Sequence, residues 1–171
     1  EIRGSLRKLR DRSREMVRNF PYAKQAKRTT QINVVGTGMK FQSLVTQVRG
    51  NKRDQKTNKA IEEAWADWCR PENCDTAGRH SFHQFEWLAT GALPESGEAI
   101  FRIVRKPFGS GGVPLALQLI ESDLLDEEYN GKVTAKNNEW RNGVEVDEWG
   151  RPTRYAILTR HPGDAYYLNA P

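Results

Sequence analysis

The stretch NGVEVDEWGRPTRYAILTRHPGD, residues 142–164, is the most distinctive part of this sequence. Val144 and Val146 alternate with acidic residues, and Tyr155 and Ile157 repeat the same period beyond the corner DEWGRP. Period-2 alternation on both sides of a Gly/Pro corner predicts a β-hairpin. The stretch contains no nucleophile, metal-ligand set or phosphate-binding loop. It therefore predicts a fold and not a reaction.

The segments before the hairpin are predicted to form helices, strands and loops. Helices are expected at 6–20, 21–30, from 57 or 58 to about 69, and from a capping box formed by Ser81 and Gln84 to Gly91 or Pro94. Strands are expected at 98–106 and 113–121, and one or two strands interrupted at Gly36 and Gly38 at 31–45. Loops are expected at 49–58, 70–80 and 108–112. Helices first and mostly antiparallel strands after favour an α+β fold.

The net charge of +5 is unevenly distributed along the chain. Residues 1–56 hold 15 Lys and Arg against 4 Asp and Glu, a net of +11. Residues 57–171 hold 12 against 18, a net of −6. A basic front and an acidic body predict a polyanionic partner, or an acidic protein partner that is itself another copy of the chain.

Size and composition limit the class of protein. A chain of 171 residues is expected to form one domain, or one domain with an appendage. No run of 18 apolar residues is present, so no membrane partner is expected. Two cysteines, Cys69 and Cys74, do not make a disulfide framework and favour a reducing setting. The first residue is Glu1 and not Met, which indicates a piece of a longer chain.

A zinc site is the first chemical alternative. Its ligands would be Cys69, Cys74, His80 and His83, but the spacing differs from that of zinc fingers. The favoured interpretation is one buried cysteine, one loop cysteine and two surface histidines. We expect no metal and no cofactor.

A metal-dependent nuclease is the second alternative. Its carboxylates would come from the acidic run Glu121, Asp123, Asp126, Glu127 and Glu128. No Lys or His lies nearby in sequence to complete such a site, and charge runs are more often solvated faces. The glycine-rich pieces at 36–38 and 108–112 lack the features of a P-loop. We therefore expect no catalytic residue and no enzyme.

An arginine stripe is the best candidate for a binding surface. Arg7, Arg10, Arg14 and Arg18 recur three or four residues apart along the first predicted helix. Such a stripe can contact DNA phosphates, which would make the chain a nucleic-acid-binding module. It can equally pair with the acidic body of the same or an adjacent subunit. No aromatic side chains interleave with the arginines, so protein contact is favoured.

The order of seven segments resembles the N-terminal part of phage portal proteins of the lambda family. The segments are RNFPYA (18–23), VVGTGMKF (34–41), IEEAWADWC (61–69), CDTAGRHSFHQF (74–85), ESGEAIFRIVRK (95–106), PLALQLIESDLL (114–125) and GVEVDEWGRPTRYAI (143–157). The resemblance implies a non-enzymatic structural subunit of a ring, a dodecamer, at one capsid vertex. Double-stranded DNA would pass through its channel during packaging and ejection.

The resemblance also implies partners and a place in the virion. The expected partners are other copies of the chain, the terminase, and capsid, head-completion and head-tail connector proteins. The expected locations are the virion and, during assembly, the host cytoplasm. Residues 1–30 would be a basic helical segment and residues 31–171 a wing-like α+β body. The stem, the clip and the return half of the wing would follow Pro171.

Overall fold

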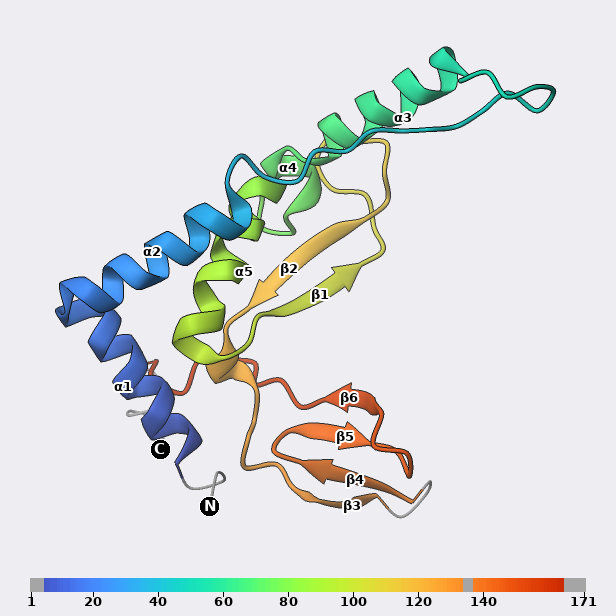
Figure 1. Cartoon of the computed structure of the whole chain (residues 1–171). Coiled ribbons are helices and arrows are strands. Elements are labelled where there is room, and N and C mark those ends of the chain that lie inside the picture. The colour runs from blue at the N-terminus through green and yellow to red at the C-terminus, as the bar shows by residue number, and fades with distance from the viewer. Residues whose placement is uncertain (1–4, 134–136, 165–171) are drawn as a thin grey trace. The chain divides into compact units, whose positions relative to one another are not determined.

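The computed structural model describes residues 5–133 and 137–164 (Figure 1). Two compact units are present: unit 1 comprises Glu1–Arg12 with Ile120–Pro171, and unit 2 comprises Ser13–Leu119. Helices come first along the chain and strands follow, in one two-stranded and one four-stranded sheet. The α+β fold class is therefore confirmed. The division into residues 1–30 and 31–171 stays a prediction.

The first two helices are separated by a proline. Helix α1 spans Leu6–Asn19 and α2 spans Pro21–Val35. Phe20 between them is extended, with φ −110° and ψ 118°, as expected for a residue that precedes proline. Pro21 opens α2, where the missing N–H costs no hydrogen bond. The predicted helices at 6–20 and 21–30 are both present, and the second is five residues longer.

The predicted strands at 31–45 are wrong. Residues 31–35 complete α2, and Gly36, at φ +53°, ends it. The cause is packing against helix α5, Phe82–Ser96. The buried Gln31 amide donates to the Trp87 carbonyl at 2.9 Å, and a Cβ on Gly91 would lie 2.5 Å from that amide. Tertiary contact here overrides the strand preference of the β-branched residues that follow Gln31.

Two of the other helices of unit 2, α3 and α5, begin at a side-chain cap. Helix α3, Gln55–Trp68, begins at Asp54, whose carboxylate accepts the Thr57 N–H at 3.1 Å. The short helix α4 spans Pro71–Cys74, inside the predicted connector. The predicted capping box of Ser81 and Gln84 is confirmed at the start of α5. That helix continues past Pro94 to Ser96 and ends at Gly97 in the left-handed conformation, at φ +80°.

The core of unit 2 lies between the helices and a two-stranded sheet. Strands β1, Ile100–Val104, and β2, Ala116–Ile120, run in opposite directions (Figure 1). The buried residues of this core are Trp68, Cys74 and Phe85, and the partly buried residues packed on them are Trp65, Cys69, Phe82, Phe101, Val113, Leu115, Leu117 and Leu119. Trp68 is buried, while Ile61 on the same helix is exposed.

The loop at 108–112 packs closely on α4. The buried Asn73 side chain accepts the Gly111 N–H at 2.9 Å and donates to the Asp67 carbonyl at 2.8 Å. A Cβ on Gly109 would lie 2.5 Å from the Asn73 amide oxygen and 2.6 Å from the Glu72 carbonyl. Glycine in this loop therefore permits a close backbone approach.

Unit 1 is built on a four-stranded antiparallel meander. Its strands are β3, Gly131–Val133, β4, Asn138–Arg141, β5, Val144–Val146, and β6, Pro152–Tyr155, in that spatial order. The short 3₁₀ helix η2, Ser122–Leu124, precedes them. The pairing of β5 with β6 confirms the predicted hairpin.

Two tight turns set the register of the meander. Asn142 and Gly143 join β4 to β5 with φ values of +50° and +80°, the conformation of a two-residue Asn-Gly hairpin turn. At the corner between β5 and β6, the Asp147 carboxylate accepts the N–H groups of Trp149 and Arg151 at 2.9 and 2.8 Å. Gly150 there has φ +76°. The turn residues thus support the strand pairing on both sides of β5.

Among the helices that lie within residues 5–133 and 137–164, none is long and apolar enough to cross a lipid bilayer.

Candidate functional site

The predicted arginine stripe lies on α1, but its members have different surroundings. Arg7 and Arg18 are exposed, Arg14 is half-buried, and Arg10 is only 5% exposed. Arg7 and Arg10 belong to unit 1, and Arg14 and Arg18 belong to unit 2. The structure therefore does not present the four side chains as one uniform surface.

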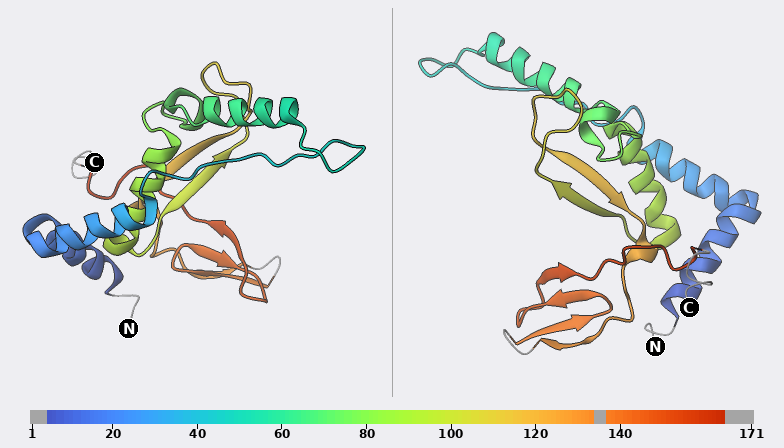
Figure 2. Two further views of the ribbon diagram at one scale, coloured as in Figure 1. Left: turned by 45° about the horizontal axis from the view of Figure 1, so that its top comes forward. Right: turned by 180° about the vertical axis from the view of Figure 1, so that it is seen from behind.

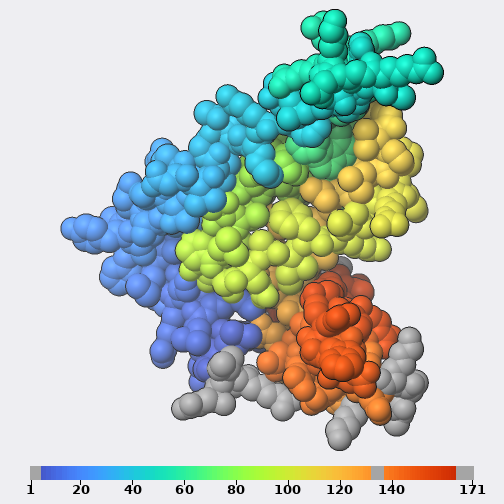
Figure 3. Space-filling model, turned by 45° about the vertical axis from the view of Figure 1, so that its right-hand side comes forward, coloured from blue at the N-terminus to red at the C-terminus, as the bar shows by residue number. Residues whose placement is uncertain are grey.

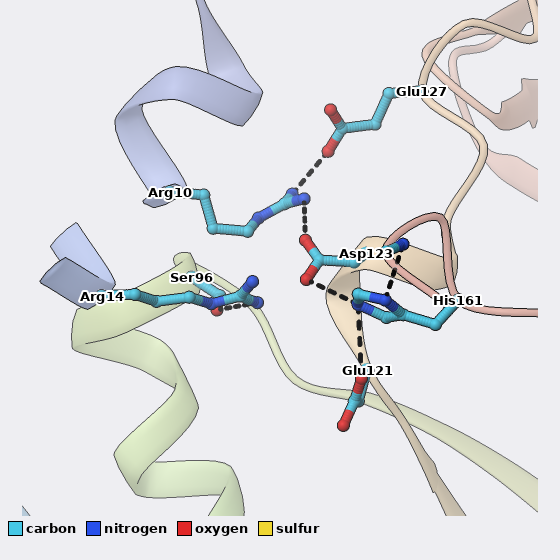
Figure 4. A network of polar contacts seen from close by, with 8 residues as sticks. Arg10, Arg14, Ser96, Glu121, Asp123, Glu127 and His161 are labelled. Atoms are coloured by element: carbon cyan, nitrogen blue, oxygen red, sulfur yellow. Dashed lines mark hydrogen bonds and ion pairs between the residues drawn. The ribbon is translucent and has the colours of Figure 1, made fainter. Parts of the chain in front are cut away.

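Arg10 is the centre of an ion-pair network in unit 1 (Figure 4). Its two terminal nitrogens donate to Asp123 Oδ1 at 3.2 Å and to Glu127 Oε1 at 2.5 Å. Asp123 belongs to η2, and Glu127 lies shortly after that helix. Both carboxylates are largely buried, so they are held away from the water that screens surface pairs. Arg10 thus joins the first turns of α1 to the acidic run.

His161 completes the network from the end of the described chain. Its Nε2 lies 3.2 Å from Asp123 Oδ2 and 3.7 Å from Glu121 Oε2. Its Nδ1 accepts the Gly163 N–H at 3.0 Å. A neutral ring that accepts at Nδ1 carries its proton on Nε2, so it donates to Asp123. Arg10 and His161 therefore both contact the acidic run.

Arg14 contacts the C-terminal end of α5. Its guanidinium donates to the Ser96 hydroxyl at 3.3 Å, and the neighbouring Ser13 hydroxyl donates to the Pro94 carbonyl at 3.2 Å. Both acceptors lie at the C-terminal end of α5. Helix C-terminal carbonyls have few intrahelical partners, so donors from another helix are well placed there.

The acidic run does not form a set of metal ligands. Asp123 and Glu127 face Arg10, while Asp126 accepts the Glu128 N–H at 3.3 Å in a local turn. Among the residues that the structure describes, no three His, Cys, Asp or Glu side chains gather in the way a metal ion needs. The geometry that a two-metal nuclease requires is therefore not formed by these carboxylates.

The cysteines and histidines of the zinc alternative point to different partners. The buried Cys74 thiol donates to the His80 carbonyl at 3.3 Å and to the Cys69 carbonyl at 3.6 Å. Burial, with the nearby charges of Cys69 and Asp75, raises the pKa of the Cys74 thiol to about 11. A thiol of this kind is a poor source of thiolate at neutral pH. Cys74 is thus a small core residue here.

The Asp75 carboxylate organises the loop before α5. It accepts N–H groups from Ala77, Arg79 and His80 at 2.9 to 3.0 Å, and His80 Nδ1 lies 3.2 Å away. Burial alone would raise the pKa of Asp75, but these hydrogen bonds outweigh burial and lower it. His83 is engaged separately, 3.4 Å from Glu86. These contacts are structural.

A buried carboxylate lies inside the meander of unit 1. Glu145 is 1% exposed, although the alternation in β5 places it where a solvent-facing residue is expected. Its Oε1 accepts from Asn138 and from Arg154 Nη2, each at 2.9 Å, and its Oε2 accepts from Arg154 Nε. The Arg154 guanidinium also lies over the Trp140 ring, 5.7 Å from the centroid. These contacts satisfy the buried charge.

Glu145 makes the stability of unit 1 depend on pH. Hydrogen bonds from Arg154, partly opposed by burial, lower the pKa of the Glu145 carboxyl from 4.5 to about 2. Its stabilising contribution is thus fully present above pH 4.5 and is lost as the pH falls toward 2. We expect Glu145→Gln to unfold at lower urea concentration than the parent at neutral pH. This difference should disappear near pH 2.

The control for this prediction is Glu139→Gln, which changes a half-exposed carboxylate, paired with Arg141, on the neighbouring strand β4. Urea midpoints across the acid range measure both variants. A difference between Glu145→Gln and the parent that does not vary with pH would contradict the role assigned to Glu145.

Several large apolar side chains are exposed. Trp149 at the β5–β6 corner is 77% exposed, and its backbone is held by Asp147. In unit 2 the exposed set comprises Met16, Phe20, Tyr22, Ile32, Val34, Met39, Phe41, Leu44, Val45, Val48, Ile61, Leu88, Leu93 and Ile103. Exposed apolar side chains indicate a protein-contacting surface where they lie together in one patch.

Comparison with known proteins identifies a family. The family described as "Phage portal protein, lambda family" matches residues 1–170. A curated relative, the "Probable portal protein" of Halomonas phage phiHAP-1, is 39% identical over 159 residues. That match covers 92% of this chain and 30% of the relative. The chain belongs to the lambda family of phage portal proteins.

Proposed function

We propose that this sequence is part of the portal subunit of a tailed phage. Copies would assemble into a ring, a dodecamer, at one capsid vertex, and double-stranded DNA would pass through the ring during packaging and ejection. The terminase and the head-completion and head-tail connector proteins would dock on the same ring. The family match over residues 1–170 carries this proposal. The chain spans 30% of the curated relative, so the proposal concerns the whole protein of which these residues form a part.

The chemistry of the described residues supports a structural role. The polar groups of the candidate site are engaged within the protein: Arg10 with two carboxylates, Glu145 with Arg154, and the Cys74 thiol with two carbonyls. In the arginine stripe, Arg7 and Arg18 are the exposed members. We assign to these two the contact with DNA or with a neighbouring subunit, and to Arg10 and Arg14 contacts within their own units.

Electron microscopy of the full-length protein in negative stain tests the proposal. We expect rings with a central channel, and class averages that show twelve subunits. Native mass spectrometry of the same sample counts the subunits independently. A single species of monomers or dimers, at concentrations where assembly is expected, would overturn the proposal.

A further inference from the structure

Residues 39–54, which make up most of the segment between α2 and α3, are attached to the helices by hydrogen bonds. We call these residues the arm. The Met39 N–H donates to both oxygens of Glu86, at 3.0 and 3.3 Å, and the Ser43 N–H donates to Glu62 at 3.0 Å. These carboxylates belong to α5 and α3, so side chains of two helices hold the first half of the arm by its backbone.

Asn58 of α3 fixes the middle of the arm. Its side chain accepts the Val45 N–H at 2.7 Å and donates to the Val45 carbonyl at 3.0 Å, and it is buried. Phe41 packs on Trp65 of the same helix, with ring centroids 5.4 Å apart. Because the same amide side chain both accepts from and donates to the backbone of Val45, it fixes the position of the arm along α3.

The tip of the arm is a short hairpin fixed at both ends. Thr46 and Arg53 form an antiparallel bridge, and the Gln47 N–H donates to the Lys52 carbonyl at 2.9 Å. The Asp54 N–H returns to the Val45 carbonyl at 3.0 Å. Figures 2 and 3 show this tip standing out beyond the first turn of α3, away from the rest of unit 2. The bridge and these hydrogen bonds order the base of the hairpin before any partner binds, which lowers the entropic cost of docking.

The surface of the arm combines apolar and basic side chains. Met39, Leu44 and Val48 are exposed, and Val48 is fully so. Four cations are exposed on the same segment: Lys40, Arg49, Lys52 and Arg53. Within the described part of the chain, none of these four forms a salt bridge. The one acidic residue of the arm, Asp54, is engaged by both the N–H and the hydroxyl of Thr57 at the start of α3.

We propose that the arm is an assembly clasp, which docks on residues 120–164 of a second copy of this chain. The proposal rests on the proposed function and names a surface for it. Residues 120–164 hold 10 Asp and Glu against 6 Lys and Arg, a net of −4, which complements the basic arm. Opposite charges steer two such surfaces together, and the exposed Val48 provides apolar contact area at the tip.

A protein partner suits the arm better than DNA. The tip, residues 44–53, carries no aromatic side chain on which a base could stack. It presents instead a fully exposed valine among its cations, and an apolar side chain gains nothing from a phosphate backbone. Binding to DNA is therefore the competing outcome of the experiment and not the proposal.

Charge reversal in the full-length protein tests the clasp. The variant Arg49→Glu/Lys52→Glu should raise the protein concentration at which half of the subunits are in rings by about tenfold or more. The matched control is Lys24→Glu/Arg28→Glu, which makes the same change of charge at exposed positions on α2. We expect the control to assemble as the parent does. Equal assembly of both variants would overturn the clasp, while rings of the parent would still support the portal proposal.

A cross-link identifies the surface that the arm meets. A photoreactive amino acid placed at Val48 should cross-link to residues 120–164 of another copy, recognised by mixing isotopically light and heavy subunits. Cross-links to any other region, to the same chain or to DNA would overturn the proposal. Absence of rings in the parent protein would instead contradict the proposed function, so the two failures are distinguishable.

Discussion

Arg10→Ala is expected to lower the free energy of unfolding by about 3 kcal/mol, because it removes the guanidinium that offsets the charge of two largely buried carboxylates. The guanidinium now donates to Asp123 at 3.2 Å and to Glu127 at 2.5 Å. Neither carboxylate has bulk water available to replace it in full. The loss of stability therefore comes more from charge that stays buried without this guanidinium than from the loss of a favourable ion pair.

Urea denaturation measures this loss, and hydrogen exchange locates it. The amides of Asp126 and Leu158 donate to the carbonyls of Ala156 and Leu124, which tie the acidic run to the end of the described chain. We expect these two amides to lose protection in Arg10→Ala. The matched control is Arg7→Ala, one turn earlier on α1 and exposed, with an expected change within about 0.5 kcal/mol.

Two further substitutions separate the cost of buried charge from the loss of the ion pairs. Adding Asp123→Asn and Glu127→Gln to Arg10→Ala neutralises the stranded carboxylates, so this triple variant should be more stable than Arg10→Ala alone. A triple variant that is less stable by the sum of the separate effects would contradict the account of Arg10.

Local signals in the sequence predicted much of the fold. The Ser81 and Gln84 capping box, the helix that begins near residue 57 and the hairpin at 144–155 depend on neighbours a few residues away, and all three are present. The continuation of α2 through Gln31 depends on Trp87, 56 residues later, and no local pattern contains that information. The Asn142-Gly143 dipeptide was a usable signal for a further hairpin turn, and it predicts the β4–β5 connection that our sequence analysis omitted.

The candidate site was harder to predict for the same reason. The four arginines lie on α1, in a segment predicted to be helical, but spacing does not say which arginine is buried. The carboxylates that hold Arg10 lie 113 and 117 residues away in the sequence. The same limit applies to Glu145, which alternation places on the solvent side of β5 and which Arg154 and Asn138 make into a buried group. In both cases, pairing with charged or polar groups from other segments determines that the side chain is buried.

Phe85→Ala is expected to destabilise unit 2 by about 3–5 kcal/mol, because it removes a large side chain from a core that cannot close around the gap. Phe85 is 2% exposed. Its ring packs edge-on against Phe101 of β1, with centroids 5.7 Å apart, and lies at the same distance from the His80 ring. Helix, strand and loop thus meet at this one side chain.

Two further variants make the Phe85 prediction specific. Phe85→Leu retains much of the volume and should cost less, about 1–2 kcal/mol. Tyr22→Ala, on the exposed first turn of α2 where the side chain is 91% exposed, should change stability by no more than about 0.5 kcal/mol. Urea denaturation followed by the fluorescence of Trp65 and Trp68, which lie in the same core, measures all three. A loss below about 1 kcal/mol for Phe85→Ala would mean that the core of unit 2 is not organised around this ring, since a well-packed aromatic side chain cannot be removed at so small a cost.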